Sequence, residues 1–367
     1  MGETRVFAEE HAPDVADLYM RAMRGRSGPA GTALQCYFRE IFLANPWVSP
    51  EIPSLVYFDR GKLMGFLGVV PRSMDFRGRP IQAAILSQFM VDRERHKGLA
   101  ALDLLRRVIR GPQDLTFSDG AGEASHIVWT AAGGQAARLY SFNWVRILRP
   151  LETARYFLER KGGAARWLGK ASFAAAAIGD LLLCNMPPRV FRPAQPAFLS
   201  RQALAGELFE CIQEIGWRDS LKPAYEPSSF GWLMSQAAAA RSHGDLRLAT
   251  VYTPEGVRCG WYVCYVRRGG PAAVMQIGSR RRDQFEAVLL TLFHDAWREG
   301  ASFVKGQAIP QSLALLTRHH CLFRYPGSGV LVQARDPDLL YAIHSGDAAL
   351  SRLDGESWMR FATEDWT

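Results

Sequence analysis

A strand, a polar loop and the start of a helix follow one another in the segment Phe89-Met90-Val91-Asp92-Arg93-Glu94-Arg95-His96-Lys97-Gly98-Leu99-Ala100. The apolar residues before Asp92 are typical of a strand, and the periodic leucines from Leu99 predict a helix as far as Arg110. The first N–H groups of a helix have no partner within it and lie at the positive end of its dipole. Glycine at that point lets the backbone approach a phosphate closely. The loop therefore predicts a pyrophosphate site.

The elements around this loop have a recognisable order. Two amphipathic helices come first, then three strand-like runs separated by turn signals, then the helix that begins at Leu99 and one more strand. This order predicts a mixed, mostly antiparallel sheet flanked by helices, which is an α/β (α+β) fold. We expect the two helices at 11–24 and 33–44, and the strands at 54–58, 63–70, 81–91 and 115–118.

The run Arg95-His96-Lys97-Gly98-Leu99-Ala100 resembles the R/Q-x-x-G-x-G/A signature of the GNAT (N-acetyltransferase-like) acyltransferase superfamily. It is neither a P-loop nor a dinucleotide fingerprint, because their glycine and lysine patterns are absent. The flanking order of elements extends the resemblance over about residues 5–150. The resemblance implies an acyl-coenzyme A site for acetyl-CoA or another acyl-CoA. It assigns the pyrophosphate to Arg95, His96, Lys97, Gly98, Leu99 and Ala100, and the thioester carbonyl to backbone amides of Phe89, Met90 and Val91.

The catalytic groups of that family are less easily located. Its usual tyrosine, which protonates the departing thiolate, aligns either with Trp129, whose indole is no useful acid, or with Tyr140 on an expected strand. A general base must make the attacking amine neutral, and Asp119 and Glu123, with His126 beside them, follow the last strand of the motif. We predict Tyr140, Asp119 and Glu123 as catalytic candidates. A helix cap for Asp119 and a core position for Tyr140 are the structural alternatives.

The second half of the chain repeats the order of elements without the signature. The position of the loop is taken by Gly278-Ser279-Arg280-Arg281-Arg282-Asp283, which predicts a capped helix start, with a second phosphate site as the alternative. We therefore expect two GNAT-like domains, the second degenerate and shaping the acceptor cleft. The predicted ranges are 1–150 for the first domain, 151–200 for a helical connector, 201–345 for the second domain and 346–367 for a tail.

The net charge of +8, from 44 basic and 36 acidic residues, is concentrated in the first 200 residues. Residues 151–200 alone hold seven basic and three acidic side chains. Their apolar positions, among them Ile178, Leu181 and Leu182, suggest contact with a membrane surface or an acyl-carrier protein, although a helix packed between domains is favoured. Nucleic-acid binding is disfavoured, because basic and acidic residues alternate and no binding motif is present.

Other classes of site are not indicated. The six cysteines form no C-x-x-C pair and His319-His320-Cys321 has no further ligand, so no metal site is expected. Reduced thiols and the charged residues after Met1 predict a cytoplasmic protein, and no apolar run reaches the ~20 residues of a membrane span.

The sequence thus predicts an enzyme that transfers an acyl group from acyl-CoA to the amine of a small molecule by direct attack on the thioester. Two alternatives remain open. One is a non-catalytic sensor or scaffold of the same fold, and the other is an acyltransferase that uses a long-chain or carrier-bound donor at a membrane surface. The sequence says nothing of acceptor, acyl length or oligomeric state.

Overall fold

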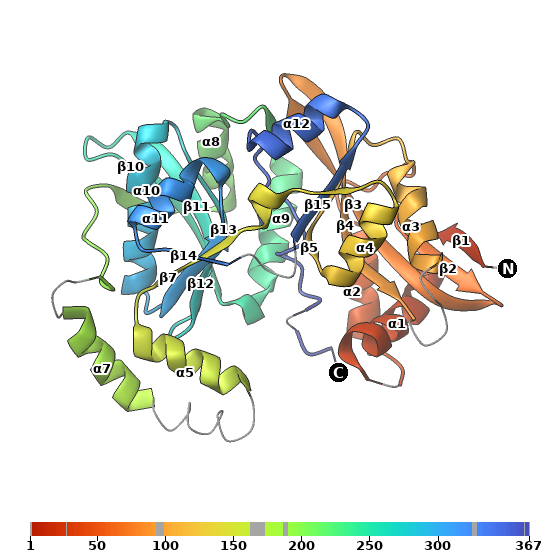
Figure 1. Ribbon diagram of the computed structural model, residues 1–367, viewed down its shortest axis with the longest axis horizontal. Coiled ribbons are helices and arrows are strands. Elements are labelled where there is room, and N and C mark those ends of the chain that lie inside the picture. Colours follow the sequence, from red (N-terminus) through yellow and green to blue (C-terminus); the bar gives the residue numbers. More distant parts are fainter. Residues whose placement is uncertain are drawn as a thin grey trace.

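Two twisted sheets lie side by side with helices on their faces (Figure 1). The computed structural model describes residues 2–26, 28–92, 99–161, 173–185, 190–324, 329–362 and 364–366. The predicted α/β class, with two mostly antiparallel sheets flanked by helices, is confirmed.

The first sheet has eight strands in the described residues, in the order β1-β2-β3-β4-β5-β15-β6, with β9 paired to β3. Its centre is the meander that the turn signals predicted. Arg60 and Arg77, in the tight turns of this meander, have positive φ. The strands are β1 (Glu3–Val6), β2 (Leu55–Asp59), β3 (Lys62–Phe76), β4 (Arg79–Val91), β5 (Leu115–Ala121), β6 (Gln135–Ala136), β9 (Leu221–Pro223) and β15 (Gly329–Ala334).

Helices cover both faces of this sheet. α1 (Ala12–Arg24) and α2 (Thr32–Phe42) bury their apolar stripes against one face, where Phe38 contacts Phe66. α3 (Leu99–Ile109) and α4 (Glu123–Ala131) cover the other, with Leu104 and Trp129 in its core. The alternation of β4 explains the division, because Ile85 belongs to the first core and Leu86 to the second.

The second sheet has seven strands in the described residues, in the order β14-β7-β13-β12-β11-β10-β8. α10 (Arg282–Arg298) packs on one face, and α8 (Ala205–Ile215) and α9 (Pro227–Ala239) pack on the other. The strands are β7 (Asn143–Ile147), β8 (Leu199–Gln202), β10 (Asp245–Tyr252), β11 (Arg258–Val266), β12 (Pro271–Ser279), β13 (Phe303–Gln307) and β14 (Leu322–Arg324).

Each sheet contains a short parallel strand pair and a bulge next to it. β4 pairs in parallel with β5 over only three residues, and β12 pairs in the same way with β13, so the longer strands continue without that neighbour. Each of these longer strands also carries a bulge in its pairing with the preceding strand. The repeated order of elements predicted from the sequence is therefore a real repetition of the fold.

The two sheets nevertheless exchange strands. β7, from the predicted first range, lies between β13 and β14 of the second sheet. β15, from the predicted second range, pairs with β5 and β6 of the first sheet. The ranges 1–150 and 201–345 remain predictions of domains, while the hydrogen-bonded sheets run across them.

The region predicted as a tail, 346–367, packs into the molecule as far as it is described. Leu353, Trp358 and Phe361 are buried in a core that also contains residues of α1, α2, α8 and α9. The shared core therefore joins the first sheet to the second. Along the chain, α5 (Pro150–Lys161) and α7 (Phe173–Asn185) come between β7 and β8. The remaining helices are α11 (Leu313–Arg318), before β14, and α12 (Pro337–Ser345), which precedes this C-terminal segment.

Candidate functional site

The bulge of β4 lies where β4 and β5 separate. Leu67 of β3 lies opposite both Gln88 and Phe89, and Gln88 has a positive φ of 51°. The N–H of Asp92 bonds Met64 on β3, so by the alternation of a strand the N–H groups of Val91 and Phe89 point to the β5 side. In the described residues β5 pairs with β4 only as far as Ile85, and beyond that residue the two strands separate. The amides of Val91 and Phe89 therefore face the space between the separated strands, called the opening below.

A carboxyl group from the far end of the chain lies against this bulge. The hydroxyl of Ser87 and the backbone N–H of Gln88 both act on the Glu356 carboxyl and lower its pKa. A side-chain carbon added at Gly120 of β5 would come within 2.2 Å of Glu356 Oε1, so the carboxyl bridges the space between the two strands. Burial and the neighbouring Asp119 raise the pKa of Glu356 to about 7.

Asp119 holds the segment that carries Glu356. Its buried carboxylate accepts from the N–H of Glu356 at 2.8 Å and from the hydroxyl of Ser357 at 3.0 Å. Arg352 lies 3.5 Å from the same carboxylate and donates to the carbonyl of Asp119 at 2.7 Å. Asp119 thus lies beside the separation of β4 and β5, and these contacts position Glu356.

The other catalytic candidates lie elsewhere. Tyr140 is in a 3₁₀ turn (Arg138–Ser141) rather than on the expected strand, and its hydroxyl donates to the carbonyl of Ala348 and accepts from its N–H. Burial raises the pKa of Tyr140 far above its usual value. Glu123 is exposed in the first turn of α4, and Trp129 is buried in the core. The catalytic roles of Tyr140 and Glu123 stay predictions.

The predicted pyrophosphate loop lies mostly outside the described residues, because these stop at Asp92 and resume at Leu99. α3 begins at Leu99, as expected for a loop that ends on a helix N-terminus, and Ala100 is fully buried against the sheet. Arg95, His96, Lys97 and Gly98 therefore remain predictions. At the bulge, Gln88 Oε1 is buried and accepts no hydrogen bond from any described residue. It could accept a hydrogen bond from an amide N–H of a bound ligand.

A pocket of about 690 Å³, open mouth included, lies on the second sheet next to the separation of β12 and β13, where residues 216–219 and 348–352 also line it. Arg352 forms part of its wall and links it to Asp119, and Asp219 is a partly buried carboxyl within it. Burial and then Asp347 raise the pKa of Asp219. The wall is otherwise largely apolar and aromatic, with Trp217, Trp261, Val274, Ile277 and Ile309.

A buried polar network lies beside this pocket. Tyr225 hydrogen-bonds Asp354, and Gln276 of β12 donates to the Tyr225 hydroxyl at 2.9 Å. The guanidinium of Arg72, on β3, stacks on Trp47 at 3.9 Å and donates to the carbonyl of Leu353. The network ties the C-terminal segment to both sheets, and the sequence contained no motif that identified it.

The second loop of arginines behaves as a helix start. Arg280 pairs with Glu214, and Arg281 pairs with Asp283 at 2.7 Å, so two of its charges are used locally. Within the described residues no group of three or more His, Cys, Asp or Glu could hold a metal ion, and His319 hydrogen-bonds Glu286. No helix of the described residues is long and apolar enough to cross a membrane.

Solved structures of similar fold include several acyltransferases. A GCN5-related N-acetyltransferase from Anabaena variabilis is 12% identical, with a TM-score of 0.56 over 92% of this chain and 74% of its own. Eis1 from Mycobacterium abscessus is 14% identical, with a TM-score of 0.51 over 94% and 76%. N-myristoyltransferase from Saccharomyces cerevisiae, solved with myristoyl-CoA and inhibitors, is 12% identical, with a TM-score of 0.51 over 90% and 79%. No protein-family model and no curated protein sequence matches the chain.

These likenesses define the class of fold. At 10–14% identity they concern architecture alone, and on that basis the chain has the fold of GNAT acyltransferases. The resemblance predicted from the Arg95 to Ala100 signature is confirmed at this level.

Proposed function

We propose that this chain is an acyl-CoA-dependent N-acyltransferase whose reaction takes place at the separation of β4 and β5. The observation that carries the proposal is the Glu356 carboxyl, with its pKa near 7, held at the β4 bulge in a fold of acyltransferases. A base is most effective when its pKa lies near the working pH, and Glu356 meets this condition.

In this proposal the residues of the chain have separate tasks. The amides of Phe89 and Val91 face the opening and polarise the carbonyl of the donor, an acetyl-CoA or another acyl-CoA. Asp119 and Arg352 position Glu356. Gln88 Oε1 offers an acceptor to the arm of the donor.

Proton transfer is assigned to Glu356 alone. It accepts the proton that the amine loses as the C–N bond forms, and it returns a proton to the sulfur as the C–S bond breaks. A single carboxyl with a pKa of about 7 can do both, so the proposal needs no acid at Trp129 or Tyr140.

The acceptor is proposed to be a small molecule with an amine and an apolar body. The pocket bounded by Trp217 and Trp261 supplies an apolar wall, and Asp219 supplies a carboxyl for a cationic group. Arg352 connects this pocket to Asp119 and so to the proposed base.

The test compares donor binding with turnover. Calorimetry with acetyl-CoA, and thiol release with acyl-CoAs of increasing chain length and a panel of amines, should show binding and transfer by the wild type. Gly98→Glu should abolish binding, because the signature loop would no longer accept a phosphate. Glu356→Gln should bind normally and lose roughly 10²–10⁴ in kcat/KM.

Glu123→Gln is the matched control, since this exposed carboxyl begins the helix that follows β5, and its activity should equal that of the wild type. Full activity of Glu356→Gln would reject the assigned base. Absence of acetyl-CoA binding by the wild type and by Gly98→Glu alike would reject the whole proposal.

A sensor of acyl-CoA is the second candidate function. It is favoured by the lack of a free tyrosine at the usual position of the acid, because Trp129 is buried and the Tyr140 hydroxyl is used by Ala348. Donor binding without thiol release, across the full amine panel, would select this alternative.

A further inference from the structure

Apart from Asp180 and Asn185, α7 consists of apolar residues and glycine, yet one of its faces is open to solvent. Ala176, Asp180 and Cys184 recur every four residues and are buried. Ile178, Leu181 and Leu182 lie on the opposite side and are 63%, 66% and 64% exposed. A helix that is apolar on all sides normally has all sides covered. In Figure 1, α7 lies at the periphery of the molecule beside α5, away from the first sheet.

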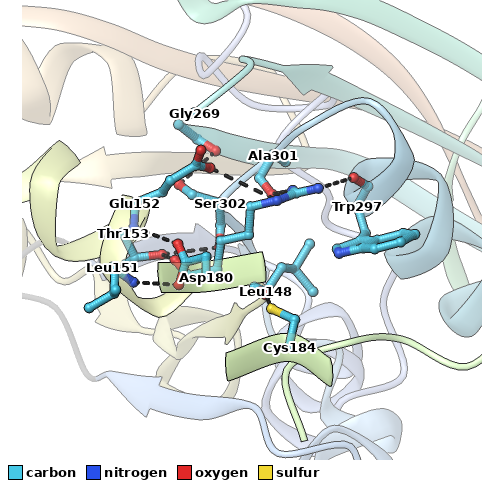
Figure 2. Close-up of polar contacts among 12 residues, drawn as sticks. Leu148, Leu151, Glu152, Thr153, Asp180, Cys184, Gly269, Trp297, Ala301 and Ser302 are labelled. Atoms are coloured by element: carbon cyan, nitrogen blue, oxygen red, sulfur yellow. Dashed lines mark hydrogen bonds and ion pairs between the residues drawn. The ribbon is translucent and has the colours of Figure 1, made fainter. Parts of the chain in front are cut away.

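The buried face of α7 is fixed by Asp180, the helix's only charged residue. Its carboxylate accepts from the N–H groups of Leu151 and Glu152, at 2.8 and 2.7 Å, and so caps the N-terminus of α5 (Figure 2). A side-chain carbon at Gly179 would come within 2.3 Å of Leu151 Cδ1, so the helices touch closely. The exposed face cannot turn inward without breaking these contacts.

Cys184 adds a third contact on the buried face, because its thiol lies 3.3 Å from the carbonyl of Leu148 (Figure 2). α5 itself is held by Thr153, whose hydroxyl bonds the carbonyl of Ser302 at 3.0 Å. The pair of helices is therefore anchored to the second sheet.

The carboxylates of these two helices are all engaged internally. Asp180 caps α5, Glu159 pairs with Arg155, and Glu152 lies 3.9 Å from Arg149. Burial also raises the pKa of Glu152. Arg160 and Lys161, at the end of α5, are exposed, so the helix pair presents positive charge as well as apolar side chains to solvent.

We infer that the outer face of α5 and α7 docks on an anionic lipid surface. Phe157 and Leu158 of α5 are also exposed, at 50% and 36%, and add apolar side chains to the surface of this helix pair. Insertion of such side chains beside lysine and arginine is the pattern of a peripheral membrane helix pair. The net excess of basic residues in 151–200, which the proposed acyltransferase site does not use, fits the same partner.

The test is co-sedimentation of the full chain with phosphatidylcholine vesicles, with and without 30% phosphatidylserine. Binding is expected to the anionic vesicles and to weaken with salt. Ile178→Ser with Leu182→Ser should reduce binding roughly tenfold or more, because two apolar side chains no longer insert. Arg160→Glu with Lys161→Glu should also reduce it about tenfold or more and remove most of the salt dependence.

The matched control is Leu204→Ser with Tyr341→Ser, since both residues are as exposed as those of α7 but lie on other elements. These variants should bind vesicles like the wild type. Circular dichroism melts of all variants check that each is folded.

Three results would overturn the inference: no binding of the folded wild type to anionic vesicles, equal binding by the Ile178 and Leu182 variant, or equal binding to neutral vesicles. A concentration-dependent dimer in light scattering that the same variant abolishes, without vesicle binding, would instead identify a second copy of the chain as the occupant. Because vesicle binding requires no acyl transfer, its outcome is independent of the proposed enzyme activity.

Discussion

At the scale of single residues, Glu356 differs from an ordinary surface carboxyl because burial and the neighbouring Asp119 raise its pKa. Its pKa of about 7 in the fold exceeds the usual 4.5, so the folded state holds the proton more tightly than the unfolded state. Its effect on stability is therefore neutral below about pH 4.5, becomes a growing penalty as the pH rises from 4.5 to about 7, and is constant above that. Ser87 and the Gln88 amide only partly offset this penalty.

Glu356→Gln should therefore stabilise the protein at pH 8, by about 3 kcal/mol, and have little effect near pH 4.5. Glutamine occupies the same volume and cannot ionise. Urea unfolding of wild type and variant from pH 4.5 to 8 measures the difference, with Glu123→Gln as control. A difference that does not change with pH would contradict the assigned pKa.

Asp119 should be important for stability. Asp119→Ala removes the acceptor for the Glu356 N–H and the Ser357 hydroxyl and leaves Arg352 without its carboxylate. We expect a loss of about 3 kcal/mol, since breaking a buried pair leaves a charge uncompensated. Thermal unfolding measures it. Glu123→Ala, at an exposed site, should stay within about 0.5 kcal/mol of wild type, and an equal loss in both would exclude a special role for Asp119.

Asp119 and Glu356 also show which site residues can be predicted from the sequence and which cannot. Asp119 was predicted because it follows a strand of the motif, which is local information. Glu356 is separated from it by 237 positions and belongs to a region predicted only as a tail. Neither periodicity nor spacing indicates which distant segment enters the opening between two strands, because that depends on packing of the complete chain.

At the scale of elements, periodicity predicted the helices well. The expected helices at 11–24, 33–44 and 99–110 correspond to α1, α2 and α3 within two residues at each end. The region around Tyr140 was different, because its alternation suggested a pair of strands. It forms a 3₁₀ turn and one strand, β7, and the partners of β7 come from residues beyond 300.

Capping by a side chain of another helix is an element-scale feature that the sequence did not reveal. Asp180→Ala should remove both acceptors from the N-terminus of α5 and cost about 1–2 kcal/mol. Hydrogen exchange of the amides of Leu151 and Glu152 should speed up first, ahead of those in the second sheet. Asp180→Asn, which keeps one of the two acceptor oxygens, should retain part of the protection, and equal loss in both variants would point to charge rather than capping.

At the scale of the whole molecule, the repeated order of elements correctly predicted two sheets, whereas the exchange of strands between them had no signal. β7 and β15 each have neighbours far away in the sequence, and apolar strands of five or six residues do not encode which edge they join. The consequence is that neither sheet is complete without residues from the other half of the chain. The shared core that contains Trp261, Phe230 and Phe361 has the same effect.

Unfolding should therefore be a single cooperative event. Calorimetry is expected to show one transition. The helices α8 and α9, which pack on the second sheet, share a core with α1 and α2 of the first, so melting of one sheet exposes the core of the other. Removal of residues 346–367 should prevent stable folding. It takes six large buried apolar side chains from that core, at about 1.5–3 kcal/mol each, against a typical total stability of about 5–15 kcal/mol. These residues are Leu350, Leu353, Trp358, Met359, Phe361 and Trp366.

The control for this truncation is the full-length chain with Glu356→Gln, which changes the proposed base and keeps the apolar contacts. It should melt as one transition at a temperature no lower than that of the wild type at pH 8. Two separated transitions in the wild type, or a truncated chain with near-native circular dichroism and melting temperature, would mean that the sheets are stable independently. In that case the C-terminal segment would serve only to position Glu356, and loss of activity without loss of stability would be the expected phenotype of its removal.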